Sequence, residues 1–192
     1  MTRPRKARIL EKAGLRYVAG TVNIAVLCAV IAVGAFHWSE AQAQERLHGI
    51  SDEDRHCLAQ NIFFESRNQS IEGQVAVAWV TINRMTESQF PITICAVVKQ
   101  GRKDANGNMK RNQCQFSWYC DGKSDRIPNT VIAQRAWEDA QLIANVVLID
   151  WATQEPSPVD NATFYHADYV NPYWAAEFTE VAVVDDHIFY VN

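Results

Sequence analysis

The sequence predicts a mainly α-helical domain with a small β element, preceded by one apolar N-terminal helix. Three observations support this prediction: one apolar run at Val18–Phe36, helical spacing of apolar residues through the middle of the chain, and two short β-type runs near its end. A composition of 48% hydrophobic and 21% charged residues is ordinary for a globular protein. It excludes collagen-like, disordered and multi-spanning membrane proteins.

The net charge of −4 is the average of two unlike regions. Residues 1–16 contain six Lys and Arg side chains and one acidic residue, Glu11, so the rest of the chain carries 12 basic and 21 acidic side chains. Proteins that bind nucleic acid usually present a basic folded surface. We therefore expect no nucleic-acid partner.

The N-terminal region predicts an exported protein. We expect residues 1–17 to form a basic cytoplasmic leader, residues 18–36 a transmembrane or signal helix, and residues 37–50 a polar linker. Ala41-Gln42-Ala43 is a small-x-small sequence of the kind that signal peptidase cuts. Two outcomes stay open: an inner-membrane anchor that faces the periplasm and cell wall, or secretion after cleavage near Ala43.

The exported domain is predicted to span residues 51–192. We expect its helices at about 51–67, 71–85, 93–100 and 130–149. The first begins at an N-cap, Ser51, and carries Leu58, Ile62 and Glu65 on one face because they are spaced at i, i+4 and i+7.

The β element is predicted from two runs near the C-terminus, Thr163–His166 and Val181–Val191. Asn106-Gly107 is a tight-turn signal and indicates a hairpin or an exposed loop that ends near Arg111.

Cysteine usage agrees with export. Cys28 lies in the apolar run, which leaves four cysteines: Cys57, Cys95, Cys114 and Cys120. Four cysteines allow three pairings, one of which joins Cys114 to Cys120 across the aromatic loop between them and leaves Cys57 for Cys95. A four-cysteine zinc site is the alternative, but no CxxC spacing is present. We expect no metal and no cofactor.

Glu65 is the candidate catalytic residue. A carboxylate on an apolar helix face loses hydration, which raises its pKa because the charged form is disfavoured. A carboxylic acid that keeps its proton near neutral pH is what glycosidic-bond cleavage needs as a general acid. The alternative is a solvated helix-end charge paired with Arg67 or Arg84, and periodicity alone favours that alternative.

Two clusters combine aromatic rings with polar side chains. One is Gln113–Cys120, and the other is Phe164–His166 followed by Tyr173 and Trp174. Rings stack on the C–H faces of sugars while amides and hydroxyls bind sugar hydroxyl groups. A binding cleft and a buried core are equally compatible with this pattern.

Six blocks of sequence follow one another between Asp54 and Val191. They are Asn61–Arg67, Gly73–Ala78 with Asn83-Arg84, Phe90-Pro91 through Cys95 to Gln100, Cys114–Trp118 with Cys120–Gly122, Tyr165–Asp168 with Pro172–Trp174, and His187–Tyr190. In this order and spacing they resemble the cell-wall hydrolase family that includes the spore-cortex-lytic enzymes.

The resemblance implies a lysozyme-like, mostly α fold and cleavage of the β-1,4 bond between N-acetylmuramic acid and N-acetylglucosamine in peptidoglycan. The family's catalytic glutamate falls on Glu65. The family pattern Glu-Ala-Arg-Gly-Glu reads Glu65-Ser66-Arg67-Asn68-Gln69 here, so its second carboxylate is missing. We interpret this loss as favouring a lytic transglycosylase with a single catalytic glutamate over a hydrolytic muramidase, which needs two carboxyl groups.

For this function the substrate-binding residues are predicted as Gln115, Ser117 and Tyr165 for positioning, Phe116, Trp118 and Trp174 as stacking walls, and His166 as a substrate contact. The expected partners are peptidoglycan glycan strands and, through the N-terminal helix, the membrane; we expect a monomer.

Two other classes of function stay open. One is a non-catalytic, envelope-anchored glycan-binding protein, and the other is an amidase or peptidase with a cysteine nucleophile.

Overall fold

The computed structural model describes the backbone of residues 5–192 and the side chains of residues 24–192 except 25, 33 and 34. The side chains of the predicted leader, residues 1–17, lie outside this described part. The chain divides into two compact units, Met1–Gln42 and Ala43–Asn192. The second unit contains the predicted exported domain.

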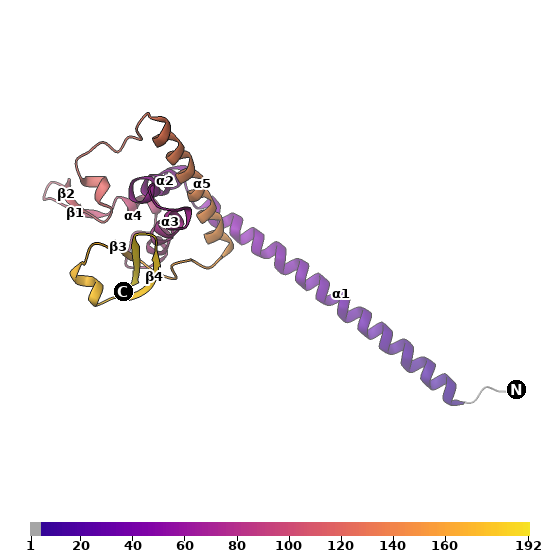
Figure 1. Cartoon of the computed structure of the whole chain (residues 1–192). Coiled ribbons are helices and arrows are strands. Elements are labelled where there is room, and N and C mark those ends of the chain that lie inside the picture. The colour runs from indigo at the N-terminus through magenta and orange to yellow at the C-terminus, as the bar shows by residue number, and fades with distance from the viewer. Residues whose placement is uncertain (1–4) are drawn as a thin grey trace. The chain divides into compact units, whose positions relative to one another are not determined.

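Helix α1, Arg5–His48, contains the described residues of the first unit, and its last residues, 43–48, belong to the second (Figure 1). Among the described residues, the stretch Val26–His48 has the length and apolar composition to cross a membrane, a test that a signal sequence near the N-terminus also passes. Residues 37–48, which we predicted as part of a linker, are helical throughout. The globular unit therefore begins at Ala43 rather than at Ser51.

Packing explains why α1 continues through this polar segment. Ala43 is buried, and Leu47 and Ile50 pack against the core. Ala43 and Leu47 are four residues apart, which places them on one side of the helix. Arg46 Nη1 also donates a hydrogen bond of 3.4 Å to the carbonyl oxygen of Ala152. The end of α1 is thus a part of the globular unit.

Four further helices form the helical core (Figure 1): α2 (Asp52–Ser66), α3 (Ile71–Thr86), α4 (Ile94–Val98) and α5 (Val131–Thr153). In each case the side-chain oxygen of the N-cap residue accepts a hydrogen bond from a backbone N–H in the first turn; the caps are Ser51, Ser70, Thr93 and Thr130. Helix α2 packs against the other three. The four predicted helices are confirmed. Helix α5 continues past its predicted end to Thr153, where the left-handed backbone of Gln154 ends it.

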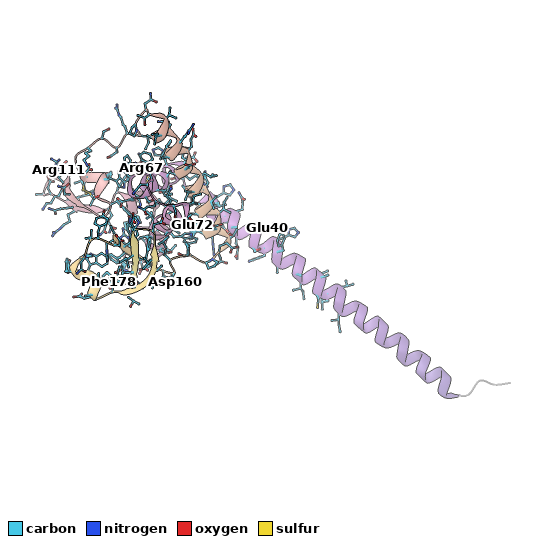
Figure 2. The ribbon with its side chains drawn as sticks, in the orientation of Figure 1. Glu40, Arg67, Glu72, Arg111, Asp160 and Phe178 are labelled. Carbon is cyan, nitrogen blue, oxygen red and sulfur yellow. A yellow bond between two sulfur atoms is a disulfide. The ribbon has the colours of Figure 1, made fainter. Side chains whose placement is uncertain are left out.

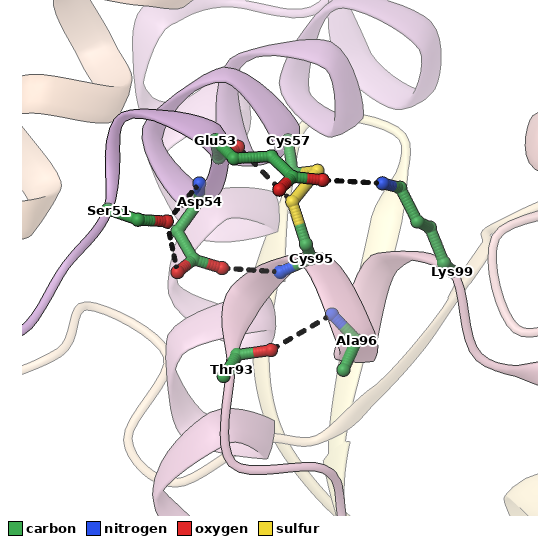
Figure 3. A network of polar contacts seen from close by, with 8 residues as sticks. All are labelled: Ser51, Glu53, Asp54, Cys57, Thr93, Cys95, Ala96 and Lys99. Carbon is green, nitrogen blue, oxygen red and sulfur yellow. Dashed lines mark hydrogen bonds and ion pairs between the residues drawn. A yellow bond between two sulfur atoms is a disulfide. The ribbon is translucent and has the colours of Figure 1, made fainter.

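A disulfide between Cys57 and Cys95 joins α4 to α2 (Figure 3). Beside it, Asp54 Oδ1 accepts a 2.8 Å hydrogen bond from the backbone N–H of Cys95, and Lys99 Nζ pairs with Glu53 Oε1 at 3.1 Å. The Glu53 carboxylate and the sulfurs of Cys57 and Cys95 lie close enough together to be ligands of one metal ion. The two sulfurs are bridged, however, so they are not thiolates and do not bind metal.

The second disulfide joins Cys114 to Cys120. The structure therefore has the pairing in which the aromatic loop is bridged and Cys57 pairs with Cys95. Because these two bridges use all four sulfurs, neither the four-cysteine zinc site nor a nucleophilic Cys114 or Cys120 is compatible with them.

Two small antiparallel sheets complete the unit. A hairpin is formed by β1 (Gly101–Lys103) and β2 (Met109–Cys114), and a three-stranded sheet, ordered β3-β5-β4, by β3 (Phe164–Ala167), β4 (Thr179–Val184) and β5 (His187–Val191) (Figure 1). Two short 3₁₀ helices are η1 (Ser117–Cys120) and η2 (Tyr173–Ala176). The predicted fold class, mainly α with a small β element, is confirmed.

The run Val181–Val191, which we predicted as one strand, is two strands. Asp185 takes a φ of 48°, and the chain turns at Asp185-Asp186 from β4 into β5. The sequence did not separate the two strands because both are rich in β-type residues and the turn between them contains no glycine or proline.

Candidate active site

Glu65 lies near the C-terminal end of α2, in the wall of a pocket of about 340 Å³. The pocket is lined by Phe64, Glu65, Arg67, Ser117, Trp118, Asp121, Lys123, Ser124 and Asp125. Ile62 and Leu58, about one and two turns before Glu65, are fully buried. Their burial fixes the orientation of α2 and leaves the Glu65 side chain partly buried between the core and the pocket.

Tyr165 is the hydrogen-bond partner of Glu65. Its hydroxyl donates to Glu65 Oε2 over 2.8 Å, from β3 to the end of α2. The Tyr165 ring packs edge-on against His187 at 5.2 Å and lies 5.6 Å from Phe189, both on β5. Because β5 pairs with β3, the sheet holds the tyrosine hydroxyl at the carboxyl group.

Arg84, from α3, lies behind this pair. It is 4% exposed, and its Nε donates a 2.6 Å hydrogen bond to the carbonyl oxygen of Thr163. Its guanidinium carbon lies 5.1–5.5 Å from three ring centres, those of Phe90, Phe116 and Phe164. The buried cation is thus held mainly by aromatic faces and one carbonyl.

The alternative of a solvated ion pair at the helix end does not match this geometry. Within the described side chains, neither Arg84 nor Arg67 forms an ion pair with Glu65. Arg67 instead donates to the Phe63 carbonyl oxygen at 3.3 Å and lies over the Phe63 ring at 4.9 Å.

Burial raises the pKa of the Glu65 carboxyl, and two opposing influences, the Tyr165 hydrogen bond and the Arg84 charge, do not cancel this effect. Burial, together with the neighbouring Glu65, raises the pKa of the Tyr165 hydroxyl well above its usual value. Tyr165 therefore stays protonated and remains a donor. The site favours a protonated Glu65 and still provides a donor and a cation for its carboxylate form.

Trp118 and Ser117 belong to the same pocket lining. The Trp118 ring stacks on Phe64 at 4.6 Å, and its Nε1 donates a 2.9 Å hydrogen bond to Asn61 Oδ1. Trp118 is 8% exposed, whereas Ser117 is exposed. The Cys114–Cys120 bridge closes the loop that carries both residues.

Phe116 lies in the core and not in the pocket wall. It is 1% exposed and packs beneath the Arg84 guanidinium. A ring without an exposed face cannot stack on a sugar, so the prediction of Phe116 as a stacking wall is wrong. Gln115 is exposed and its backbone N–H donates to Gln100 O at 2.9 Å, but it does not line the pocket.

His166 lies on the face of β3 opposite to Tyr165, because neighbouring side chains of a strand alternate between faces. Its ring stacks on Tyr190 at 5.2 Å, and its Nε2 lies 3.0 Å from the Tyr190 hydroxyl. Trp174 packs there as well, against Phe164 at 5.6 Å. Neither His166 nor Trp174 lines the Glu65 pocket, and their contact with substrate stays a prediction.

Sequence reasoning missed two residues around Glu65. Asp121 and Asp125 line the same pocket, and burial together with the charge of Asp121 raises the pKa of Asp125. A backbone hydrogen bond from Lys123 lowers the pKa of Asp121. Arg84 was considered only as the partner in a solvated ion pair, and the structure places it as a buried cation instead.

Gln69, where the resembling family has a glutamate, lies outside the pocket. Its Nε2 donates to Asp186 Oδ2 at 3.2 Å, and the backbone N–H of Asp186 donates back to Gln69 Oε1 at 3.4 Å. An amide fits this position because a carboxylate would face the carboxylate of Asp186. The missing carboxylate at position 69 therefore says nothing about how many carboxyl groups the pocket holds.

The turn between β4 and β5 is joined to the start of α3 next to Gln69. Asp185 Oδ2 accepts hydrogen bonds from the Ser70 backbone N–H at 2.9 Å and from Ser70 Oγ at 2.7 Å, where the helix dipole favours an anion. A side chain at Gly73 would collide with this carboxylate. The contact anchors β5, the strand that pairs with the Tyr165 strand.

Comparison with known proteins identifies the family. The family model described as Cell Wall Hydrolase matches residues 68–190. The chain belongs to this family. The family resemblance predicted from the sequence blocks is confirmed, and the matched segment begins after Glu65.

This cell wall hydrolase is similar to several curated proteins. It is 29% identical over 143 residues to a spore cortex-lytic enzyme of Bacillus cereus, an alignment that covers 74% of this chain and 46% of the relative. A spore cortex-lytic enzyme of Halalkalibacterium halodurans is 28% identical over 142 residues, which cover 73% of this chain and 36% of the relative. The chain thus spans less than half of the length of either relative.

Two solved structures share the fold. One is the catalytic domain of the Bacillus cereus SleB protein, with a TM-score of 0.51, 26% identity, and coverage of 74% of this chain and 92% of that one. The other is the catalytic domain of the germination-specific lytic transglycosylase SleB from Bacillus anthracis, also with a TM-score of 0.51, 26% identity and 74% coverage of this chain, and with 98% coverage of that one.

Proposed function

We propose that this cell wall hydrolase cleaves the β-1,4 bond between N-acetylmuramic acid and N-acetylglucosamine in peptidoglycan, with Glu65 as the catalytic residue. The observation that carries the proposal is the state of Glu65. Its carboxyl group lies in a pocket wall, its pKa is raised by burial, and it accepts a 2.8 Å hydrogen bond from Tyr165. Similarity to spore cortex-lytic enzymes and to the catalytic domain of a lytic transglycosylase supports the same chemistry.

The proposed reaction is a lytic transglycosylation. Protonated Glu65 gives its proton to the glycosidic oxygen as the bond from that oxygen to C1 of the muramic acid residue breaks. Glu65, now a carboxylate, takes the proton of the C6 hydroxyl of the same sugar, and O6 bonds to C1. The products are a free 4-hydroxyl and a 1,6-anhydro ring, with no water consumed. The attacking hydroxyl is already part of the substrate, which lowers the entropic cost of the step.

Tyr165 and Arg84 serve the second half of this reaction. The carboxylate form of Glu65 accepts the Tyr165 hydrogen bond and lies in the field of the buried Arg84 charge, and both lower the pKa of Glu65. They therefore limit the rise that burial causes, so that Glu65 is able to lose its proton as well as keep it. Ser117 and Trp118, which line the same pocket, are placed to contact the sugar.

Hydrolysis is the second candidate, because two more carboxyl groups line the pocket. Asp121 and Asp125 line the same pocket as Glu65. A muramidase needs a second carboxyl group to activate water or to stabilise the sugar cation. Asp121, whose pKa is lowered by the Lys123 N–H, is the better candidate for a group that must stay ionised.

Product analysis distinguishes the two reactions. The purified full-length protein is incubated with peptidoglycan, and the glycan ends of the released fragments are identified by mass spectrometry. Anhydro ends, lighter by one water than reducing ends, are expected. Reducing ends that disappear in the Asp121→Asn variant would replace the transglycosylase proposal with hydrolysis.

The site of action follows from the same proposal. The enzyme acts outside the cytoplasmic membrane, with the basic residues 1–17 inside and α1 as an anchor or as a signal helix cleaved near Ala43. Two disulfides in the globular unit fit an oxidising compartment. The glycan strand is the expected partner.

A further inference from the structure

The basic residues of the globular unit are concentrated in one short stretch. Of the 12 Lys and Arg residues that follow residue 16, seven lie between positions 99 and 126, against three acidic residues there. The rest of the sequence after residue 16 is strongly acidic. These seven are Lys99, Arg102, Lys103, Lys110, Arg111, Lys123 and Arg126.

Most of these cations come from the β1–β2 hairpin and have no carboxylate partner. Arg102, Lys103 and Lys110 are exposed, and among the described side chains none of them forms an ion pair or a hydrogen bond. Three unpaired charges on one small hairpin form a positive surface, which we call the basic hairpin. Figure 2 shows Arg111 on the same hairpin, whereas Arg67 lies at the end of α2.

The basic hairpin is held against the lining of the Glu65 pocket. Arg111 Nε donates a 3.0 Å hydrogen bond to the backbone carbonyl of Asp121, and Lys123 pairs with Asp121 Oδ2 at 3.4 Å. Gly122 has a φ of 81° and lies directly beside the Arg111 guanidinium, where a side chain would crowd it. The Cys114–Cys120 bridge joins the end of β2 to the loop that carries Ser117 and Trp118. The end of the hairpin that carries Arg111 and Cys114 is therefore joined to the loop that lines the pocket.

A recess lies beside the hairpin strands. It has a volume of about 560 Å³, and its lining includes Lys99, Lys103, Gln100 and Tyr119. Lys99 is paired with Glu53, and Lys103 is not paired within the described side chains. Cations, an amide and a tyrosine make the lining suitable for a peptide chain that carries carboxylates.

We propose that the basic hairpin and this recess bind the carboxylates of the peptide stems on the glycan strand whose sugars enter the Glu65 pocket. This proposal rests on the proposed function. Charge complementarity selects this occupant: peptidoglycan carries its negative charge on peptide carboxylates, and the unpaired cations lie on a hairpin that is joined to the loop lining the pocket. The enzyme, acidic as a whole, then binds an acidic polymer through a locally positive surface.

The test measures binding separately from cleavage. Full-length protein with Glu65→Gln, in a nonionic detergent, is co-sedimented with purified insoluble peptidoglycan. The triple variant Arg102→Glu/Lys103→Glu/Lys110→Glu is expected to bind about tenfold more weakly at low salt, and the difference should shrink in about 0.5 M salt, where exposed charges are screened. Circular dichroism confirms that the variant is folded, and Lys110→Glu alone is a milder second variant.

A matched control separates the hairpin from a general charge effect. Arg135 is an exposed cation on α5 and outside the basic hairpin, so Arg135→Glu changes the net charge as much as Lys110→Glu does. Only Lys110→Glu should weaken binding. Peptidoglycan whose stem carboxyl groups have been amidated should bind the parent protein and the triple variant equally.

Equal binding of the triple variant and its parent to unmodified peptidoglycan would overturn the proposal. Loss of binding to phosphatidylglycerol vesicles, with peptidoglycan binding intact, would also overturn it and assign the surface to a membrane. These outcomes differ from a failure of the proposed function, which would appear as fragment release by the Glu65→Gln protein.

Discussion

The hydroxyl of Tyr165 donates a 2.8 Å hydrogen bond to Oε2 of Glu65, a residue 100 positions earlier in the chain. This contact joins the end of α2 to β3 at the wall of the pocket. Two influences act on the pKa of Glu65 in opposite directions: burial favours the protonated acid, and the hydrogen bond from Tyr165 favours the carboxylate. A group that must act first as an acid and then as a base needs both influences.

Removal of the tyrosine hydroxyl tests this balance. In Tyr165→Phe the carboxylate loses a donor, so the pKa of Glu65 rises further and the alkaline limb of the pH profile of kcat/KM moves to higher pH. We expect a loss of about tenfold at the optimum, because a hydrogen bond to a charged group is lost. The measurement is the rate of peptidoglycan solubilisation as a function of pH.

Tyr190→Phe is the matched control for this experiment. Tyr190 is on the neighbouring strand β5, and its hydroxyl contacts His166 Nε2 at 3.0 Å rather than Glu65. Its removal should leave the alkaline limb in place. An unmoved limb in Tyr165→Phe, or a shift to lower pH, would contradict the assigned role of Tyr165.

Burial of Glu65 also predicts how stability depends on pH. The folded protein holds the Glu65 proton more tightly than the unfolded chain, whose carboxyl has its ordinary value of 4.5. As pH rises through 4.5 and then through the raised folded pKa, the unfolded state binds fewer protons, so the wild type loses stability. The Glu65→Gln protein lacks this loss, and its Tm should exceed that of the wild type increasingly as pH rises.

Thermal unfolding followed by circular dichroism at several pH values checks this trend. Glu138→Gln is the control, since Glu138 is exposed on α5. A Tm difference between Glu65→Gln and wild type that stays constant with pH would show that Glu65 is not held in a protonated state.

The two disulfides should contribute unequally to stability. The Cys57–Cys95 bridge closes a sequence separation of 38 and the Cys114–Cys120 bridge one of 6. Loop-closure entropy predicts losses of about 4 kcal/mol for the Cys57→Ser/Cys95→Ser variant and about 2 kcal/mol for Cys114→Ser/Cys120→Ser. Denaturant titration measures both, and a larger loss for the short loop would contradict the prediction.

Gly73 tests the contact between the β4–β5 turn and α3. In Gly73→Ala the new methyl group collides with the Asp185 carboxylate, which displaces it from Ser70. We expect a loss of about 1–3 kcal/mol in the free energy of unfolding. In the Asp185→Ala background the same change should cost less, because the colliding group is gone, and equal costs in both backgrounds would count against the contact.

Local signals predicted the helices well. Ser51 and Thr130 are polar caps before apolar spacing, and the structure uses both as N-caps. The position of Glu65 beside Leu58 and Ile62 on one helix face also followed from periodicity. Each of these depends on residues close together in the sequence.

Long-range contacts decided what the sequence did not predict. Phe116 resembled a stacking residue until the structure placed Arg84, from α3, against its ring. Asp121 and Asp125 entered the pocket because the Cys114–Cys120 bridge and Arg111 bring their loop to α2. No local pattern in a polar loop reports such contacts.

The most direct test of the account is the activity of the Glu65→Gln protein on purified peptidoglycan, with Glu138→Gln as a folded control of equal charge change. General acid–base catalysis contributes about 10²–10⁴-fold, so release of soluble fragments should fall by at least about a hundredfold in Glu65→Gln and stay unchanged in Glu138→Gln. Fragment release by Glu65→Gln at the wild-type rate would contradict the central claim that Glu65 is the catalytic acid and base.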